Sequence, residues 1–311
     1  MNSFDTLGIE PGRAICYSGF REGSAPGDVW PTYDEVKEDL LLLQDRLQYL
    51  RLYDVDQHAA TVLEVIRKEG LDFKVMLGAF IEAEMNNFGC PWGGGVYTAE
   101  QLAHNREENL QKMHRLAKWA NEYPGIVFSL SVGNEACVDW TDHYVPVRHV
   151  IEYVRIVKQA ASQPVTFCEN YVPWLNKLKP LADELDFISI HTYPVWEYKH
   201  IHESLEYTRQ NYESVVQQYP DKPVVITEAG WATNSNGRGI DPENVSEDNQ
   251  AIYFEDLMAW SEAAGVLTFF FEAFDESWKG SPEPLEPEKH WGVFKIDRTP
   301  KKVMEPFFQT F

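Results

Sequence analysis

Two glutamates each follow a run of β-branched residues that is typical of a buried strand. Glu135 ends the run at residues 126–135, and Glu228 follows Val224, Val225 and Ile226 in the run at residues 223–231. In a parallel sheet covered on both faces, strands are near-continuous apolar runs of this kind. Two such strands that deliver carboxylates at the same end would bring them together. Paired carboxylates are the groups that cleave a glycosidic bond.

The elements that must position this pair alternate along the whole chain. Apolar spacing and breaker residues predict strands at residues 14–19, 50–54, 73–81, 126–135, 164–168, 186–193, 223–231 and 266–274. The first helix should follow the N-cap Thr32, which has Glu35 at capping-box spacing. The other helices are predicted at residues 59–69, 99–122, 146–161, 175–185, 201–219, 250–264 and 302–311.

This alternation predicts an α/β protein with a parallel sheet. A doubly wound sheet would carry a glycine-rich phosphate turn after its first strand, and residues 19–23 do not match GxGxxG. Eight strands and eight helices instead predict a single (β/α)8 barrel, with one catalytic domain at residues 1–311. The active site of such a barrel lies at the carboxyl ends of its strands. Glu135 and Glu228 close strands four and seven, so they should face each other across the mouth.

Composition excludes several other classes of function. The chain has 311 residues with 27 Lys plus Arg against 49 Asp plus Glu, a formal charge of −22. Such an acidic surface repels nucleic acid and anionic membrane, so we expect neither as a partner. The four cysteines have no CxxC spacing, and HExxH, P-loop and GxSxG motifs are missing. We therefore expect neither a metal nor a cofactor.

Four segments together resemble glycoside hydrolase family 17, in the retaining barrel clan A. They are RLYD at 51–54, VGNE at 132–135, TEAGW at 227–231 and FEAFDESWK at 271–279. The similarity extends over residues 14–297. It implies retaining, internal cleavage of a laminarin-like β-1,3-glucan, with Glu135 as general acid/base and Glu228 as nucleophile. The pKa values of the two carboxyls would then have to differ.

The resemblance also gives roles to residues near the pair. Tyr193 matches the tyrosine that ends the family's sixth strand, and it would donate to Glu228. Asn134 would bind the sugar 2-hydroxyl, or alternatively stabilise a turn. His191 stands where plant members usually have asparagine, and we interpret it as a structural hydrogen bonder.

Arg51 lies at the tip of the second strand, where it could hold Glu228 ionised through a charge-assisted hydrogen bond. The alternative is a surface ion pair with Asp54 or Asp56.

Two further groups of residues are candidates for substrate binding or for tuning pKa values. An acidic-basic cluster resembles one that the family keeps beside its catalytic pair, although a solvated ion pair is the alternative; it comprises Glu272, Glu276 and Lys279. Four rings at or just beyond strand ends could line a glucan groove, or pack in the core; they are Tyr17, Trp140, Trp231 and Trp278.

Three other functions remain open from the sequence. A glucanosyltransferase of the same family would use a sugar hydroxyl in place of water. A barrel glycosidase for β-1,4 linkages is the second alternative, and a non-catalytic carbohydrate-binding barrel is the third. We expect a monomer, exported to the periplasm or the medium because a polymer cannot cross a membrane. No signal peptide is visible at the start of the sequence, so a cytoplasmic location is the alternative.

Overall fold

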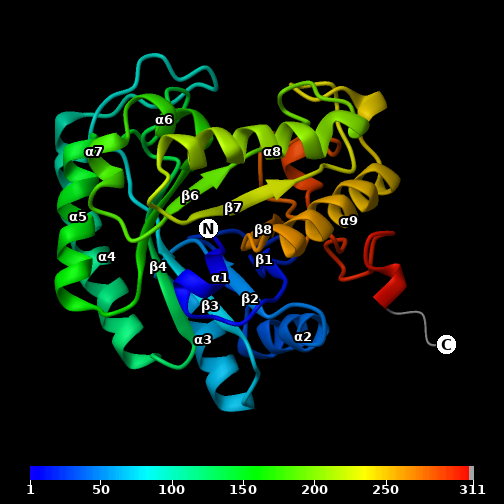
Figure 1. Ribbon diagram of the computed structural model, residues 1–311, viewed down its shortest axis with the longest axis horizontal. Coiled ribbons are helices and arrows are strands. Elements are labelled where there is room, and N and C mark those ends of the chain that lie inside the picture. Colours follow the sequence, from blue (N-terminus) through cyan, green and yellow to red (C-terminus); the bar gives the residue numbers. More distant parts are fainter. Residues whose placement is uncertain (308–311) are drawn as a thin grey trace.

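The computed structural model describes residues 1–307, whose strands close into a parallel barrel in chain order (Figure 1). The ring closes where β1 pairs with β8, with Ala14 opposite Phe269. The strands are β1 (Ala14–Cys16), β2 (Tyr49–Leu52), β3 (Lys74–Ala79), β4 (Val127–Asn134), β5 (Val165–Asn170), β6 (Ile188–His191), β7 (Val224–Gly230) and β8 (Thr268–Phe271). The predicted (β/α)8 fold is therefore confirmed.

The long helices surround this barrel on its outside (Figure 1). The helices are α1 (Ser3–Leu7), α2 (Tyr33–Leu43), α3 (Gln57–Glu69), α4 (Ala99–Glu122), α5 (Val147–Ala160), α6 (Tyr171–Asn176), α7 (Lys179–Ala182), α8 (Ile201–Gln218) and α9 (Glu247–Ala264). The capping box of Thr32 and Glu35 starts α2, as the spacing predicts. In α5 a stripe of Val150, Val154 and Val157 packs inward. Within residues 1–307, no helix is long and apolar enough to cross a membrane.

Several predicted bounds were wrong. The helix expected at 175–185 is two short helices, α6 and α7, and Pro180 lies at the start of α7, where its missing N–H costs nothing. The last strand stops at Phe271, where the next N–H, that of Glu272, donates to Trp291 O, which belongs to no strand. The sequence also missed α1, a five-residue helix capped by Asn2.

The predicted final helix, 302–311, lies partly outside the described residues. Within 302–307 the chain forms only a short 3-10 helix, η3 (Glu305–Phe307), which contains Pro306. Proline cannot donate the N–H that a continuing helix needs.

The barrel wall is buried on both faces, which makes it a rigid frame for the mouth. Every residue of β7 is buried, and so is every residue of β2, β6 and β8. Such close packing leaves little room for a strand to shift without losing contacts. Side chains at the carboxyl ends of these strands are thus held in fixed positions.

Candidate active site

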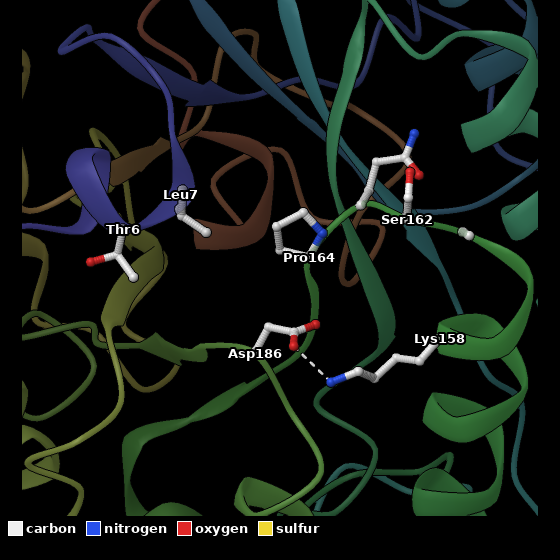
Figure 2. Close-up of a pocket in the computed structure, with 8 residues that line it drawn as sticks. Thr6, Leu7, Lys158, Ser162, Pro164 and Asp186 are labelled. Atoms are coloured by element: carbon white, nitrogen blue, oxygen red, sulfur yellow. Dashed lines mark hydrogen bonds and ion pairs between the residues drawn. The ribbon is translucent and has the colours of Figure 1, made fainter.

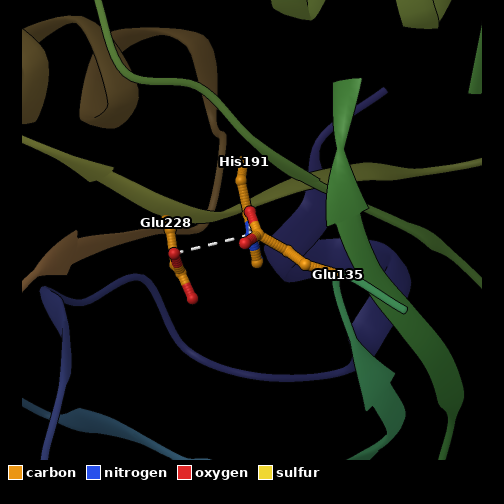
Figure 3. Close-up of side chains that lie close together, drawn as sticks. All are labelled: Glu135, His191 and Glu228. Carbon is orange, nitrogen blue, oxygen red and sulfur yellow. Dashed lines mark hydrogen bonds and ion pairs between the residues drawn. The ribbon is translucent and has the colours of Figure 1, made fainter. Parts of the chain in front are cut away.

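Glu135 and Glu228 converge at the carboxyl-terminal mouth of the barrel, with His191 between them (Figure 3). One oxygen of each carboxylate and one ring nitrogen of His191 all lie within 4.8 Å of one another. Carboxyl groups about 5–5.5 Å apart are typical of retaining glycosidases, whereas inverting enzymes separate them by about 6.5–9.5 Å. The separation here matches the retaining arrangement.

Glu228 lies within β7 and is surrounded by groups that stabilise its charge. Arg51 Nη1 donates to its Oε1 at 2.5 Å, Tyr53 Oη donates to the same oxygen at 3.0 Å, and Tyr193 Oη donates to Oε2 at 2.6 Å. Burial alone would raise the pKa of Glu228, but the charges of His191 and Arg51 and the hydroxyl of Tyr193 lower it to about 2. Glu228 is therefore an ionised carboxylate at neutral pH.

The predicted contacts of Arg51 and Tyr193 with Glu228 are thus present. The alternative ion pair of Arg51 is not the one formed, because Asp54 pairs with Lys112 at 2.7 Å instead. Tyr53 was missed, although it lies two residues after Arg51. Side chains two apart on a strand point to the same face, so this spacing could have found it.

His191 is more than the structural hydrogen bonder that we expected. Its Nδ1 lies 2.8 Å from Oε1 of Glu135 and 3.5 Å from Oε2 of Glu228. Burial alone would lower the pKa of His191, but the negative charge of Glu228 and contacts with Cys168 and Glu135 raise it to about 10. His191 links the two carboxylates, and its position opposite Glu228 in the β6–β7 register explains why.

Glu135 stands on a strained turn just after β4. Its φ is 48°, in the left-handed region, and the side chain is 17% exposed. For a residue with a Cβ this conformation costs roughly 1–2 kcal/mol. Gly133, two residues earlier, has φ 86°, and a Cβ there would lie 2.7 Å from Ile81. Strain of this kind persists where the surrounding structure fixes it, often at functional sites.

A groove of about 1000 Å³ opens above the carboxylates, at the upper end of the usual range for ligand sites. Trp140 and Trp278 line it and are 38% and 39% exposed, so their rings can meet a ligand. Asn134 also lines the groove, and its Oδ1 accepts a hydrogen bond from Arg51 Nη2. Tyr17 borders the groove but is buried, and its hydroxyl donates to Asp39 at 3.0 Å.

The prediction that Trp231 lines the groove was wrong. Its ring is fully buried, its Nε1 donates to Asn244 O at 3.0 Å, and it packs against Tyr253 of α9. Trp231 lies three residues after Glu228, and side chains alternate between the two faces of a strand. An odd spacing therefore turns the indole outward, to the helices.

The acidic-basic cluster lies beside the pair and is not a solvated ion pair. Lys279 Nζ contacts Glu272 at 2.7 Å and Glu276 at 2.5 Å, and both carboxylates are buried. Burial raises the pKa of Glu272 well above its usual value, whereas Lys279 outweighs burial at Glu276 and lowers the pKa there. Glu276 and Lys279 line the groove, whereas Glu272 lies 1% exposed.

Glu135, His191 and Glu228 could also be considered as ligands of a divalent cation. Two positive groups oppose this interpretation. Arg51 already bonds Glu228, and the raised pKa of His191 keeps a proton on the ring that a metal would have to displace. The arrangement fits proton transfer better than metal binding.

A second, smaller pocket of about 330 Å³ lies at the opposite end of the barrel (Figure 2). It lies where β5 and β6 begin, beside α1, and the ion pair of Lys158 and Asp186 at 2.7 Å lines it. None of the predicted site residues lies there.

Comparison with known proteins finds one relative named for glucan cleavage and another named for the cell surface. A probable glucan endo-1,3-beta-glucosidase, btgC, from Aspergillus clavatus is 26% identical over 269 residues, which are 80% of this chain and 36% of that protein. The cell surface mannoprotein MP65 of Candida albicans is 21% identical over 204 residues, 64% of this chain and 51% of that protein. The chain thus spans only a third to a half of these relatives' length.

Two solved structures share the barrel over nearly its whole extent. An endo-laminarinase from Formosa Hel1_33_131 has a TM-score of 0.83 and 25% identity, covering 99% of this chain and 89% of that one. A family 17 β-1,3-glucanosyltransferase from Rhizomucor miehei has a TM-score of 0.72 and 23% identity, covering 93% and 95%. A family model matches residues 14–292, so the chain belongs to the BtgE/BtgC glycoside hydrolase domain family.

Proposed function

We propose that this chain is a retaining endo-β-1,3-glucanase, with Glu228 as nucleophile and Glu135 as general acid/base. The observation that carries the proposal is the separation of the two carboxylates, one oxygen of each lying within 4.8 Å of the other at the floor of a large groove. The name of the Formosa neighbour, an endo-laminarinase, supports a laminarin-like substrate.

In the first step, ionised Glu228 attacks the anomeric carbon while Glu135 gives a proton to the departing oxygen. The low pKa of Glu228 keeps its charge available. The hydrogen bond between His191 Nδ1 and Glu135 Oε1 holds a proton between these two groups, next to the leaving oxygen. The C–O bond breaks, and a glycosyl ester on Glu228 forms.

In the second step, Glu135 takes a proton from a water molecule, which attacks the same carbon from the face that the leaving group vacated. The ester bond to Glu228 breaks, and the sugar leaves with its original configuration. Asn134 lines the groove beside Glu135 and is our candidate for the 2-hydroxyl contact, which strengthens in the transition state.

The groove supports internal cleavage of a polymer. Residues at the carboxyl end of each of the eight strands, or in the segment that follows it, line the groove, and its exposed rings include Trp140, Trp278 and Trp92. Aromatic faces suit the C–H side of glucose rings. We expect several sugar units to bind on both sides of the carboxylates.

We further propose that the chain acts as a monomeric, single catalytic domain outside the cytoplasm. A polymer substrate favours export, and the name of the MP65 relative, a cell surface mannoprotein, supports this location. Light scattering should give the mass of one chain, and a mass twice that value would overturn the monomer.

Laminarin hydrolysis followed by NMR tests the main proposal. The β-anomer of new reducing ends should appear first and convert to the α-anomer only by mutarotation. Oligosaccharides of several lengths should appear early, as internal cleavage requires. An initial α-anomer would contradict retention, and release of glucose alone would contradict internal cleavage.

Transfer to a second sugar is the alternative outcome of the same intermediate. The groove supports it, because a lining that extends past the carboxylates can hold an acceptor in place of water. Incubation with concentrated laminarihexaose separates the two functions. Products longer than the substrate would favour the glucanosyltransferase, and cleavage of β-1,4-glucan in place of laminarin would favour the other glycosidase.

A further inference from the structure

Glu169 is a buried carboxyl group close to the active site, for which the mechanism above has no use. It lies on β5, which pairs with β4 and β6, and its side chain is 0% exposed. A fully buried side chain cannot touch a sugar. No ion pair of Glu169 is formed among residues 1–307, although burying a carboxylate without a cation is costly.

The hydrogen bonds of Glu169 lead to the turn that carries Glu135. Its Oε2 accepts the backbone N–H of Cys137 at 2.8 Å, and its Oε1 accepts the N–H of Asn170 at 2.8 Å. The N–H of Glu135 itself donates to Cys168 O, the residue before Glu169, at 2.9 Å. The end of β5 therefore holds the turn at two points on either side of Ala136.

This support acts where the backbone is strained. Glu135 has a φ of 48°, which relaxation would move toward the ordinary negative range. Cys137 lies two residues after Glu135. Its backbone N–H is the first one after the strained residue that donates a hydrogen bond to a side chain. Burial and the charge of Glu135 raise the pKa of Glu169 to about 8.

We propose that Glu169 is a positioning residue, which fixes the left-handed turn of Glu135 through the N–H of Cys137 and so keeps the acid/base carboxyl in line with the glycosidic oxygen. The inference rests on the proposed function, since it gives Glu169 its effect through Glu135. Loss of this support should harm the steps that need proton transfer and spare the attack by Glu228.

The variant Glu169→Gln keeps the shape of the side chain but replaces one of its two acceptor oxygens with an NH₂ group. An NH₂ group cannot accept a hydrogen bond from the backbone N–H of Cys137 or Asn170. We expect kcat on laminarin to fall by roughly 10²-fold, the cost of a misplacement of about 1 Å. With a 2,4-dinitrophenyl β-laminaribioside, whose leaving group needs no proton, the first step should stay fast. A burst of dinitrophenol should then precede a slow steady state.

Sodium azide distinguishes a misplaced base from a damaged fold. Azide attacks the anomeric carbon of the glycosyl ester, the bond to Glu228 breaks, and a β-laminaribiosyl azide forms without any proton transfer. Azide should therefore raise the steady-state rate of Glu169→Gln several-fold, as it should for Glu135→Ala. It should not do so for the wild type.

Thr166→Val is the matched control on the same strand. Thr166 is also fully buried, and its hydroxyl bonds Phe187 O and Ser189 Oγ at 2.9 Å, away from the turn. The control should lower the melting temperature without creating a burst or an azide effect. Active sites are counted in every sample by trapping with a 2-deoxy-2-fluoro-laminaribiosyl fluoride, so that unfolded protein does not enter kcat.

Glu169→Asp is the second variant, since it keeps the carboxyl group but shortens the reach to Cys137. If both variants retain the wild-type rate, or lose activity with no response to azide, the inference is overturned. It is also overturned if neither variant gives any trapped enzyme, because the carboxyl then serves the fold as a whole. If the wild type itself fails to cleave laminarin, the result overturns the proposed function and not the role of Glu169 alone.

Discussion

The two ends of the barrel use charged side chains in different ways. At the amino-terminal end, Asp186 accepts Lys158 Nζ on Oδ1 at 2.7 Å and the N–H of Val165 on Oδ2 at 2.8 Å (Figure 2). Both carboxylate oxygens of Asp186 therefore accept hydrogen bonds from the protein. At the carboxyl-terminal end, Oε1 of Glu135 bonds His191 Nδ1, Oε2 has no hydrogen-bond partner among residues 1–307, and the side chain is partly open to the groove (Figure 3).

The difference shows which carboxylates are available for chemistry. Asp186 links the starts of two strands, and such a surface pair contributes at most about 1 kcal/mol. Glu228 is surrounded by donors, which stabilise its charge, while one oxygen of Glu135 has no hydrogen-bond partner in the described part of the chain. Four substitutions test this contrast, in order of decreasing expected effect.

The largest effect should come from Glu228→Gln at the carboxyl-terminal end. The amide is nearly isosteric but cannot attack the anomeric carbon, so kcat on laminarin should fall by roughly 10⁴-fold or more. Binding of laminarihexaose, measured by calorimetry, should change little, because attack matters only in the transition state. Unchanged turnover would instead favour the non-catalytic carbohydrate-binding barrel.

Glu135→Gln should have the second largest effect, and its size should depend on the leaving group. On laminarin we expect a loss of about 10²–10⁴-fold, the usual contribution of general acid–base catalysis. Pre-steady-state release of dinitrophenol from the aryl laminaribioside should be nearly normal, because that group leaves without a proton. Equal damage to both substrates would argue against the acid role.

Tyr193→Phe should move the acidic limb of the pH profile. Removing the hydroxyl deprives Glu228 of a hydrogen bond to its charged form, worth about 1.5–3 kcal/mol. This free energy corresponds to a rise of roughly one to two units in the pKa of Glu228. Activity needs ionised Glu228 and is lost as pH falls through its pKa, about 2 in the native protein. The limb of kcat/KM should therefore shift to higher pH, and a shift to lower pH would refute the assignment.

The lowered pKa of Glu228 also affects stability. It stabilises the fold above the ordinary glutamate pKa of 4.5, and this contribution is lost as pH falls toward 2. Part of it should be missing in Tyr193→Phe, so the difference in melting temperature from wild type should shrink between pH 5 and pH 2.5.

The smallest effect should come from Asp186→Asn at the opposite end. Losing the ion pair with Lys158 should lower the free energy of unfolding by less than about 1 kcal/mol, because both side chains are more than a third exposed. Urea denaturation measures this change. kcat/KM on laminarin should equal that of the wild type, and a tenfold loss would show that the two ends are coupled.

The sequence carried enough information for the barrel and for the pair at its mouth. Runs such as residues 223–231 are apolar on both faces, and a strand covered on both sides has few other possible structures. Once the strands were in order, Glu135 and Glu228 had to share one end. Helix bounds were harder to predict: one helix was expected at residues 175–185, but residues 177 and 178 separate α6 from α7.

The environment of the pair was harder to predict because it depends on register and on turns. His191 meets Glu228 through the pairing of β6 with β7, and its partner Glu135 lies on a turn with positive φ. Neither the register nor the φ can be read from one sequence. Strand alternation, however, could have placed Tyr53 with Arg51 and turned Trp231 away from the groove.

Trapping of the intermediate tests the assignment of Glu228 as the nucleophile most directly. The protein is incubated with a 2-deoxy-2-fluoro-laminaribiosyl fluoride, digested, and mapped by mass spectrometry. The added mass should lie on the peptide that contains Glu228, and Glu135→Ala should still form the adduct, since fluoride leaves without a proton. An adduct on another carboxylate, or inhibition without any covalent adduct, would contradict the account.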